Sequence, residues 1–137
     1  MTQRASGPSP FEAAIGFSRA VRVGERILVS GTAPVEADGS STPGDAAAQT
    51  QRVLAIIIGA IEELGGSAGD IVRTRMFIVD PADADAIGGV HGQVFGEVRP
   101  ASTMVVVAAL LRPEWRVEIE AEAVVASPAP ALLGPSG

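Results

Sequence analysis

The sequence contains no cysteine, and this absence excludes a disulfide, a thiolate nucleophile and a cysteine-ligated zinc ion. Lysine, tyrosine and asparagine are also absent, which excludes a lysine Schiff base and proton transfer by a tyrosine hydroxyl. His91 is the single histidine. A metal site with several histidines is therefore excluded, and a serine–histidine–carboxylate triad would have to include His91.

Long apolar runs are missing as well, since no uncharged apolar stretch reaches the roughly 18 residues that predict a membrane span. Residues 1–10 are polar and lack the apolar segment of a signal peptide. With neither cysteine nor a leader, we expect a cytoplasmic location. The formal net charge of −6 disfavours contact with phosphate backbones, so we expect neither a nucleic-acid partner nor a membrane partner.

A length of 137 residues predicts one domain. A chain of this size buries roughly 68% of the surface that its unfolded form exposes, which is enough for a core without metals or disulfides. The two ends, residues 1–12 and 127–137, are rich in proline, serine, alanine and glycine and show no periodicity. We therefore expect flexible terminal segments on either side of an ordered domain over residues 13–126.

The first half of this domain predicts a hairpin and a helix. Strand-like residues over 17–32 are interrupted by Gly24-Glu25, a pair that suits a type II′ turn. Over 45–64, apolar residues recur every three or four positions. This spacing predicts an amphipathic helix that ends at Gly65-Gly66.

The second half predicts three strands and another helix. A strand over 71–79 precedes Asp80-Pro81, which suits the N-cap and first position of a helix that ends near Phe95. The run 103–110 is almost wholly apolar, as in a strand buried on both faces. Residues 116–125 alternate, with three glutamates on one face. The order ββαβαββ predicts an α/β (α+β) domain with helices packed on one face of a mixed sheet.

Several short motifs resemble those of the RidA (YjgF/YER057c/UK114) family in order and spacing. They are Gly16–Val21, Val29–Gly31, Asp70–Thr74, Phe95-Gly96, Pro100-Ala101 and Val117–Ala121. The resemblance covers residues 15–126. It implies a chorismate-mutase-like fold and a homotrimer with clefts between subunits. It also implies hydrolysis of enamines and imines to a 2-keto acid and ammonia.

Residue by residue, the resemblance assigns three positions of the family's cleft to this chain. The glutamate that positions water in the family matches Glu118, which is the predicted catalytic residue. The serine of the Ser-Gly motif matches Ser30. The aromatic position, usually tyrosine in the family, is Phe17, so a hydroxyl group is lost.

Two polar groups of the family's cleft are missing. The family's arginine, which holds the substrate carboxylate, normally follows Pro-Ala, but here Pro100-Ala101 is followed by Ser102. The asparagine of the second helix is replaced by Gly88. A guanidinium holds a carboxylate through two charge-assisted bonds, whereas Ser102 offers one neutral bond of roughly half the strength. The chain therefore resembles an arginine-lacking branch of the family.

Two interpretations stay open for each charged candidate. Glu118 either lies in the cleft or belongs to a solvated row of carboxylates on its strand. Arg75 either forms an ordinary cross-strand ion pair or replaces the missing arginine as a ligand-binding cation. Arg99 is a second candidate for that replacement. His91 is either a partly buried structural group or, because its ordinary pKa lies near neutrality, a general base.

These features favour a homotrimer that binds a small metabolite, an anion or an imine, between its subunits. Glu118 would orient water for hydrolysis of an imine, an enamine or a related C=N bond. The ligand-binding candidates are Phe17, Ser30, Arg75, His91, Ala101 and Ser102. No glycine-rich phosphate loop or histidine cluster occurs, so we expect neither a metal nor an organic cofactor.

The sequence leaves two alternatives to hydrolysis. The first is a non-catalytic trimer that binds a ligand or stabilises proteins, which the loss of the arginine and the asparagine favours. The second is the ribonuclease activity sometimes attached to this family. The acidic charge and the lack of a basic strip with aromatic residues disfavour a ribonuclease.

Overall fold

The computed structural model describes residues 2–126. The strands are β1 (Thr2–Ala5), β2 (Ala20–Val23), β3 (Arg26–Thr32), β4 (Ile71–Ile78), β5 (Ala101–Val106) and β6 (Val117–Val124). The helices are α1 (Phe11–Ile15), α2 (Ala46–Glu63) and α3 (Ala84–Phe95), with short 3-10 turns at Ala68–Asp70 and Pro81–Asp83. From β2 to β6 the predicted order ββαβαββ is confirmed.

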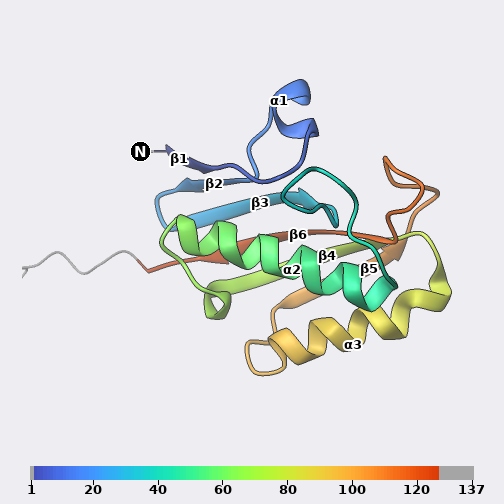
Figure 1. The fold of residues 1–137 in the computed structure, drawn as a ribbon. Helices are drawn as coiled ribbons and strands as arrows, with labels where there is room; N and C mark the ends of the chain where they lie inside the picture. The colour runs from blue at the N-terminus through green and yellow to red at the C-terminus, as the bar shows by residue number, and fades with distance from the viewer. Residues whose placement is uncertain (1, 127–137) are drawn as a thin grey trace, which may run out of the picture.

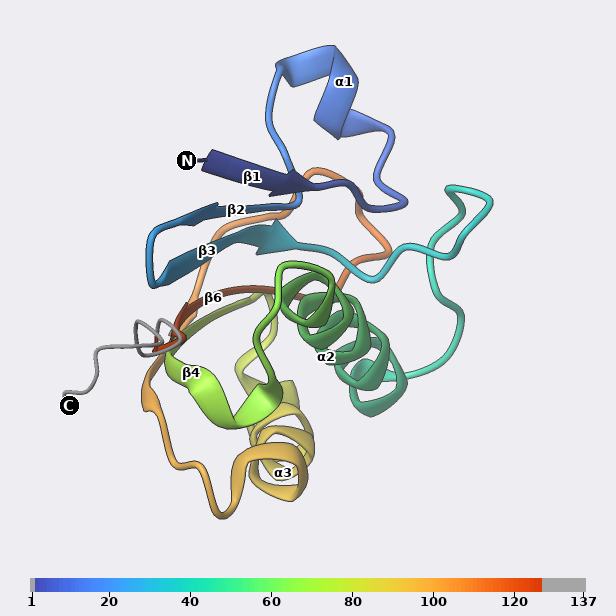
Figure 2. The same ribbon diagram turned by 90° about the vertical axis from the view of Figure 1, so that its left-hand side faces the viewer.

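The strands form one mixed sheet in the order β1-β2-β3-β6-β4-β5. β4 and β5 are parallel, and the other neighbouring pairs are antiparallel. Figures 1 and 2 show α2 and α3 on the same face of this sheet, as predicted, which leaves the opposite face uncovered by helices. α3 connects β4 to β5, because a parallel pair needs a crossover connection.

The core lies between the two long helices and the sheet. The predicted apolar stripe of α2 is confirmed, with Val53, Leu54, Ile57 and Ile61 at most 1% exposed. Asp45 caps this helix by accepting a hydrogen bond from the Ala48 amide at 2.9 Å. Such a cap satisfies one of the backbone donors that a helix leaves unpaired at its start. No helix within residues 2–126 has the length and hydrophobicity needed to cross a bilayer.

The N-terminal segment is more ordered than the sequence predicts. Residues 1–12 were expected to be loose, but Thr2–Ala5 forms an edge strand against β2, and Phe11 begins α1. Ala5 is 1% exposed, and its carbonyl accepts a hydrogen bond from the Arg19 amide at 2.9 Å. A four-residue strand is too short to show a periodic pattern in the sequence. It is ordered because it pairs with the edge of the sheet, which the sequence does not reveal. The predicted tail over 127–137 lies outside the described residues.

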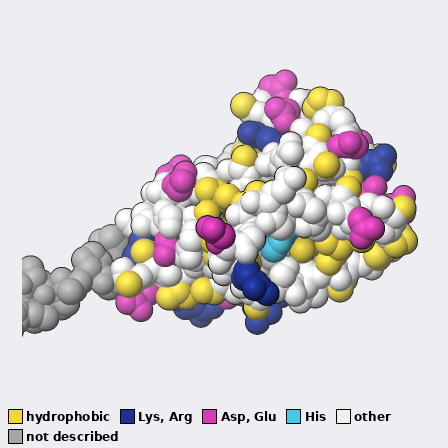
Figure 3. Space-filling model, turned by 90° about the horizontal axis from the view of Figure 1, so that it is seen from below, with side chains coloured by type: hydrophobic (Ala, Val, Ile, Leu, Met, Phe, Trp, Pro, Cys, Tyr) yellow, Lys and Arg dark blue, Asp and Glu magenta, His cyan; other side chains and the backbone are white. Residues whose placement is uncertain are grey.

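β5 also differs from its prediction. The apolar run 103–110 was expected to be a strand buried on both faces, but the strand is Ala101–Val106 and is largely exposed in the single chain. Val105 and Val106 are 42% and 53% exposed. The reason is the position of β5 at the edge of the sheet, where only β4 is its neighbour. Figure 3, a view from below, shows hydrophobic side chains on this side of the molecule.

Candidate functional site

The pairing of β4 with β6 distinguishes one glutamate from the other two. On the open face of the sheet, Glu118 lies directly opposite Phe77. Each of the other two glutamates lies opposite an arginine, and these pairs are Arg75–Glu120 and Arg73–Glu122. Glu118 is therefore the one member of the row without a cation across the strand pair.

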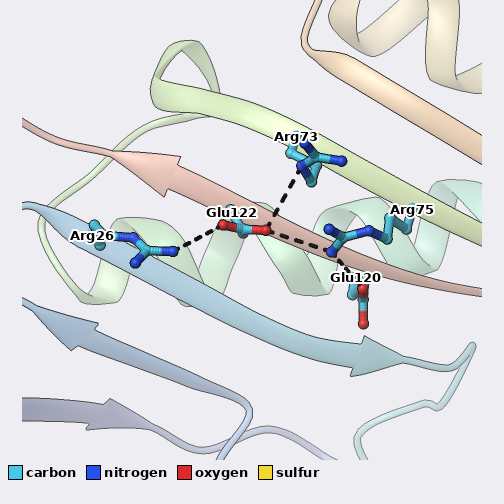
Figure 4. Close-up of polar contacts among 5 residues, drawn as sticks. All are labelled: Arg26, Arg73, Arg75, Glu120 and Glu122. Carbon is cyan, nitrogen blue, oxygen red and sulfur yellow. Dashed lines mark hydrogen bonds and ion pairs between the residues drawn. The ribbon is translucent and has the colours of Figure 1, made fainter.

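The paired glutamates form an ion-pair network on the open face (Figure 4). Arg75 Nη1 lies 2.8 Å from Glu120 Oε1 and 3.5 Å from Glu122 Oε2. Glu122 also lies 3.2 Å from Arg26 Nη2 and 3.9 Å from Arg73 Nε. Exposed pairs of this kind contribute about 0–1 kcal/mol each. The structure thus shows Arg75 in the cross-strand ion pair that was one of its two interpretations, with Glu120 rather than Glu118 as its closest acidic partner.

The carboxylate of Glu118 packs directly on Gly31. The β3–β6 register shifts between Val29 and Thr32, so Ser30-Gly31 form a bulge. A Cβ atom built on Gly31 would collide with Glu118 Oε2. Bulges often re-aim side chains next to functional sites. Gly31 therefore leaves the space that the Glu118 carboxylate occupies.

Glu118 opens into a pocket of about 330 Å³. Its polar lining consists of Ser9, Arg19, Ser30 and Glu118, and its apolar lining includes Phe11, Ile15, Phe17, Ala33, Leu111 and Trp115. The Ser30 hydroxyl donates a hydrogen bond to the Ser18 carbonyl at 2.7 Å. Since that bond uses its proton, the hydroxyl oxygen of this pocket-lining residue is left as an acceptor.

Arg19 is a pocket residue that sequence reasoning missed, although it lies within the Gly16–Val21 motif. It is 2% exposed, and its Nη1 donates to Thr32 Oγ1 at 3.3 Å. Its Nε lies 3.7 Å from Glu12 Oε2, and its guanidinium lies 5.3 Å from the ring centre of Phe17. Burial lowers the pKa of Arg19, and the charges of Glu12 and Glu118 oppose that effect.

A second polar group lies between α3 and β5, where Thr74 contacts both His91 Nε2 and Ser102 Oγ at 2.8 Å. The Thr74 hydroxyl donates to Ser102, and the direction of its hydrogen bond with His91 Nε2 follows the tautomer of the imidazole. The His91 ring packs against Phe95 with centroids 4.7 Å apart. Burial lowers the pKa of His91, which favours the neutral imidazole.

Comparison with known proteins identifies the family. A family model described as Endoribonuclease L-PSP matches residues 8–125. The crystal structure of a YjgF/YER057c/UK114-family protein from Mycobacterium tuberculosis has 41% sequence identity and a TM-score of 0.84, covering 91% of this chain and 100% of that chain. The chain belongs to the RidA (YjgF/YER057c/UK114) family. Its fold is the chorismate-mutase-like fold of RidA structures.

Two curated relatives are named as deaminases. The 2-iminobutanoate/2-iminopropanoate deaminase of Escherichia coli is 35% identical over 116 residues, which are 82% of this chain and 90% of that protein. The 3-aminoacrylate deaminase RutC of Acinetobacter baylyi is 38% identical over 94 residues, which are 68% of this chain and 74% of that protein. The RidA family therefore includes enzymes that act on imines and enamines.

The structure divides the predicted site residues of this RidA-family chain into groups. Phe17, Ser30 and Glu118 line one pocket. His91 and Ser102 meet through Thr74 instead. Arg75 lies in the ion-pair network, whereas Ala101 and Arg99 are exposed. Among residues 2–126, no group of three or more acidic or histidine side chains could hold a metal ion.

Burial raises the pKa of the Glu118 carboxyl, the Arg19 guanidinium opposes this effect, and the charge of Glu120 adds to it. A carboxyl in these surroundings releases its proton less readily than an exposed one. The shift moves the carboxyl toward the pKa range in which general acids and bases work.

Replacing Gly31 by alanine should displace the Glu118 carboxylate from its place on β3. Because the colliding atom is the end of a flexible side chain, we expect the free energy of unfolding to fall by less than about 1 kcal/mol. Gly59→Ala is the control, since no atom lies within 4 Å of its added Cβ. Crystal structures of both variants check this expectation. A Glu118 carboxylate in its parental position in Gly31→Ala would contradict it.

Replacing Glu118 by glutamine should stabilise the fold at pH 7. The folded-state pKa of Glu118 is raised, so the ionised carboxylate destabilises the fold above that pKa, and the cost disappears as pH falls through it. Denaturant unfolding at pH 7 and pH 4 should show a gain for Glu118→Gln that shrinks at pH 4. Glu120→Gln, which breaks an ion pair, should give no gain at pH 7. A loss of stability for Glu118→Gln at pH 7 would mean that attraction to Arg19 outweighs burial.

Proposed function

We propose that the chain hydrolyses the C=N bond of a small imine, or of an enamine through its imine tautomer, in the pocket beside Glu118. The observation that carries this proposal is a carboxyl group with a raised pKa, packed on Gly31 at the wall of a pocket of about 330 Å³. The family relationship to two deaminases supports the same reaction class. The products are a carbonyl compound and ammonia.

Glu118 lines the pocket and its raised pKa suits a group that both accepts and donates protons. Its ionised carboxylate accepts a proton from a water molecule as the oxygen adds to the imine carbon, and it passes that proton to the imine nitrogen to give a neutral carbinolamine. Glu118 then accepts the hydroxyl proton as the carbonyl forms and passes it to the nitrogen, so that the C–N bond breaks and ammonia leaves. The Ser30 oxygen, an acceptor in this pocket, is suited to receive a hydrogen bond from the substrate N–H group. No other reactant is consumed besides water.

A homotrimer belongs to the same proposal. β5 presents exposed valines at the sheet edge, and Leu111 and Ile15 at the pocket are 67% and 64% exposed. Apolar surface of this kind is typical of contacts between subunits. In the clefts that the family resemblance implies, the His91–Ser102 group of one subunit would lie near the Glu118 pocket of the next. That arrangement would bring together in one cleft the two sets of predicted site residues that lie apart in the single chain.

A non-catalytic ligand-binding or protein-stabilising trimer is the second candidate. The observation that favours it is Ser102, which stands where the family's arginine is expected and is engaged by the Thr74 hydroxyl at 2.8 Å. A ribonuclease is not proposed, since the chain carries a net charge of −6.

Loss of the Glu118 carboxylate should abolish imine turnover. We expect Glu118→Gln to lower kcat by roughly 10²-fold or more, the size of a general acid–base contribution. The measurement follows ammonia release from uncharged imines generated freshly by an amine oxidase and from imino acids generated by an amino-acid oxidase, with Glu120→Gln as the matched control. Turnover that is absent from the parent protein, while ligand binding is present, would favour the non-catalytic alternative.

The assembled protein should have about three times the subunit mass of 13.9 kDa. Val105 is exposed at the sheet edge of the single chain, and we expect the trimer to bury it. Val105→Glu should therefore weaken the assembly, because it would place a charge in a contact between subunits. Light scattering at micromolar concentration measures both. A monomer or a dimer for the parent protein would contradict the trimer.

A further inference from the structure

The walls of the Glu118 pocket are mostly apolar and aromatic. Trp115 is 2% exposed, and its indole N–H donates to Ser41 Oγ at 3.0 Å. Phe11 packs edge-on against the Trp115 ring, with centroids 6.0 Å apart. The Arg112 guanidinium lies 5.6 Å from the Phe11 ring centre and 5.5 Å from that of Trp115. These contacts fix two aromatic walls before any ligand binds.

The pocket has no cation free to hold an anion. Among its described lining residues, Arg19 is the only cationic side chain, and it faces Glu12 at 3.7 Å. Of residues 2–126, the buried side-chain polar atoms without a hydrogen-bond partner are Glu12 Oε2, Arg19 Nε and Arg19 Nη2. The two free Arg19 nitrogens are buried, and Nη1 donates to Thr32 Oγ1, so the guanidinium presents its charge to Glu12 rather than to a ligand in the pocket.

A ligand carboxylate in this pocket would lie near the Glu118 carboxyl with no free cation to balance the two negative charges. The one arginine of the described lining, Arg19, already faces the carboxylate of Glu12. Bringing an anion out of water beside Glu118 is costly unless a cation pairs with it. An apolar group, in contrast, gains free energy in proportion to the surface that Phe11, Phe17 and Trp115 bury.

We infer that the substrate is an uncharged imine that carries a bulky apolar group, preferably an aromatic ring, rather than a small imino acid. This inference rests on the proposed hydrolysis and names its substrate class. Phe11, Ile15 and Trp115 determine the preference for the apolar group. Glu12 determines the rejection of ligands that carry a carboxylate, because its own carboxylate neutralises the charge of Arg19.

The test uses four carbonyl products as calorimetric probes of the intact protein. Phenylacetone and phenylpyruvate differ by a methyl in place of a carboxylate, and butanone and 2-oxobutanoate repeat that difference without the ring. We expect phenylacetone to bind about tenfold or more tightly than phenylpyruvate, and more tightly than butanone. Tighter binding of either keto acid than of its methyl ketone would overturn the inference. Equal binding of phenylacetone and butanone would overturn the role of the aromatic walls.

A charge variant tests the role of Glu12. The Gly7 amide donates a hydrogen bond to Glu12 Oε1 at 3.0 Å, and Glu12→Gln keeps an oxygen that can accept it. The substitution removes the negative charge that neutralises Arg19. We expect it to bind phenylpyruvate about tenfold more tightly than the parent and phenylacetone equally well. Glu63→Gln, on the exposed end of α2, makes the same change in net charge and should alter neither affinity. Unchanged phenylpyruvate binding by folded Glu12→Gln would overturn the role of Glu12. Should that variant not fold, the four-probe comparison on the parent protein still decides.

These outcomes separate the inference from the proposed hydrolysis. Binding of phenylacetone without turnover of its imine would leave the substrate class intact and refute hydrolysis. Turnover of 2-iminobutanoate faster than of the phenylacetone imine would support hydrolysis and refute the substrate class.

Discussion

The pairing register of β4 against β6 is the constraint on which the site depends. It places an arginine opposite Glu120 and another opposite Glu122, but it places Phe77 opposite Glu118. The three glutamates on this face of β6 therefore have different electrostatic surroundings. Two are neutralised on the open face of the sheet, and the third is left without a cross-strand cation beside a glycine bulge. A two-residue shift that placed Arg75 opposite Glu118 and Arg73 opposite Glu120 would leave Glu122 as the unpaired glutamate.

The N-terminal segment gives this unpaired carboxyl its surroundings. β1 extends the sheet beyond β2, and α1 then places Phe11 and Ile15 at the pocket. Glu12 fixes the segment by accepting from the Gly7 amide and by facing the buried Arg19. A small second core of Ala33, Val35 and Trp115 supports this wall, because Phe11 packs against it. The pocket is therefore built from segments far apart in the sequence, which the sheet edge brings together.

Much of the fold could be predicted because each long element carries its own pattern. The stripe of α2 and the alternation of β6 are local signals, and the structure has both. The grouping of Phe17, Ser30 and Glu118 depended on the family resemblance. Cross-strand register is not local, so the sequence could not decide whether Arg75 pairs with Glu118 or with Glu120. Arg19 was missed for a similar reason, since its partner Glu12 lies in a segment with no periodic signal.

The central claim is that Glu118 differs chemically from its two neighbours on the same strand face. Carbon-13 NMR titration of the glutamate carboxyl groups, assigned by Glu118→Gln, tests this most directly in the assembled protein. The account predicts that the Glu118 carboxyl titrates above the ordinary value of 4.5. A Glu118 carboxyl that titrates at or below 4.5 would show that attraction to Arg19 dominates burial. The proton transfers assigned to Glu118 would then have to be abandoned.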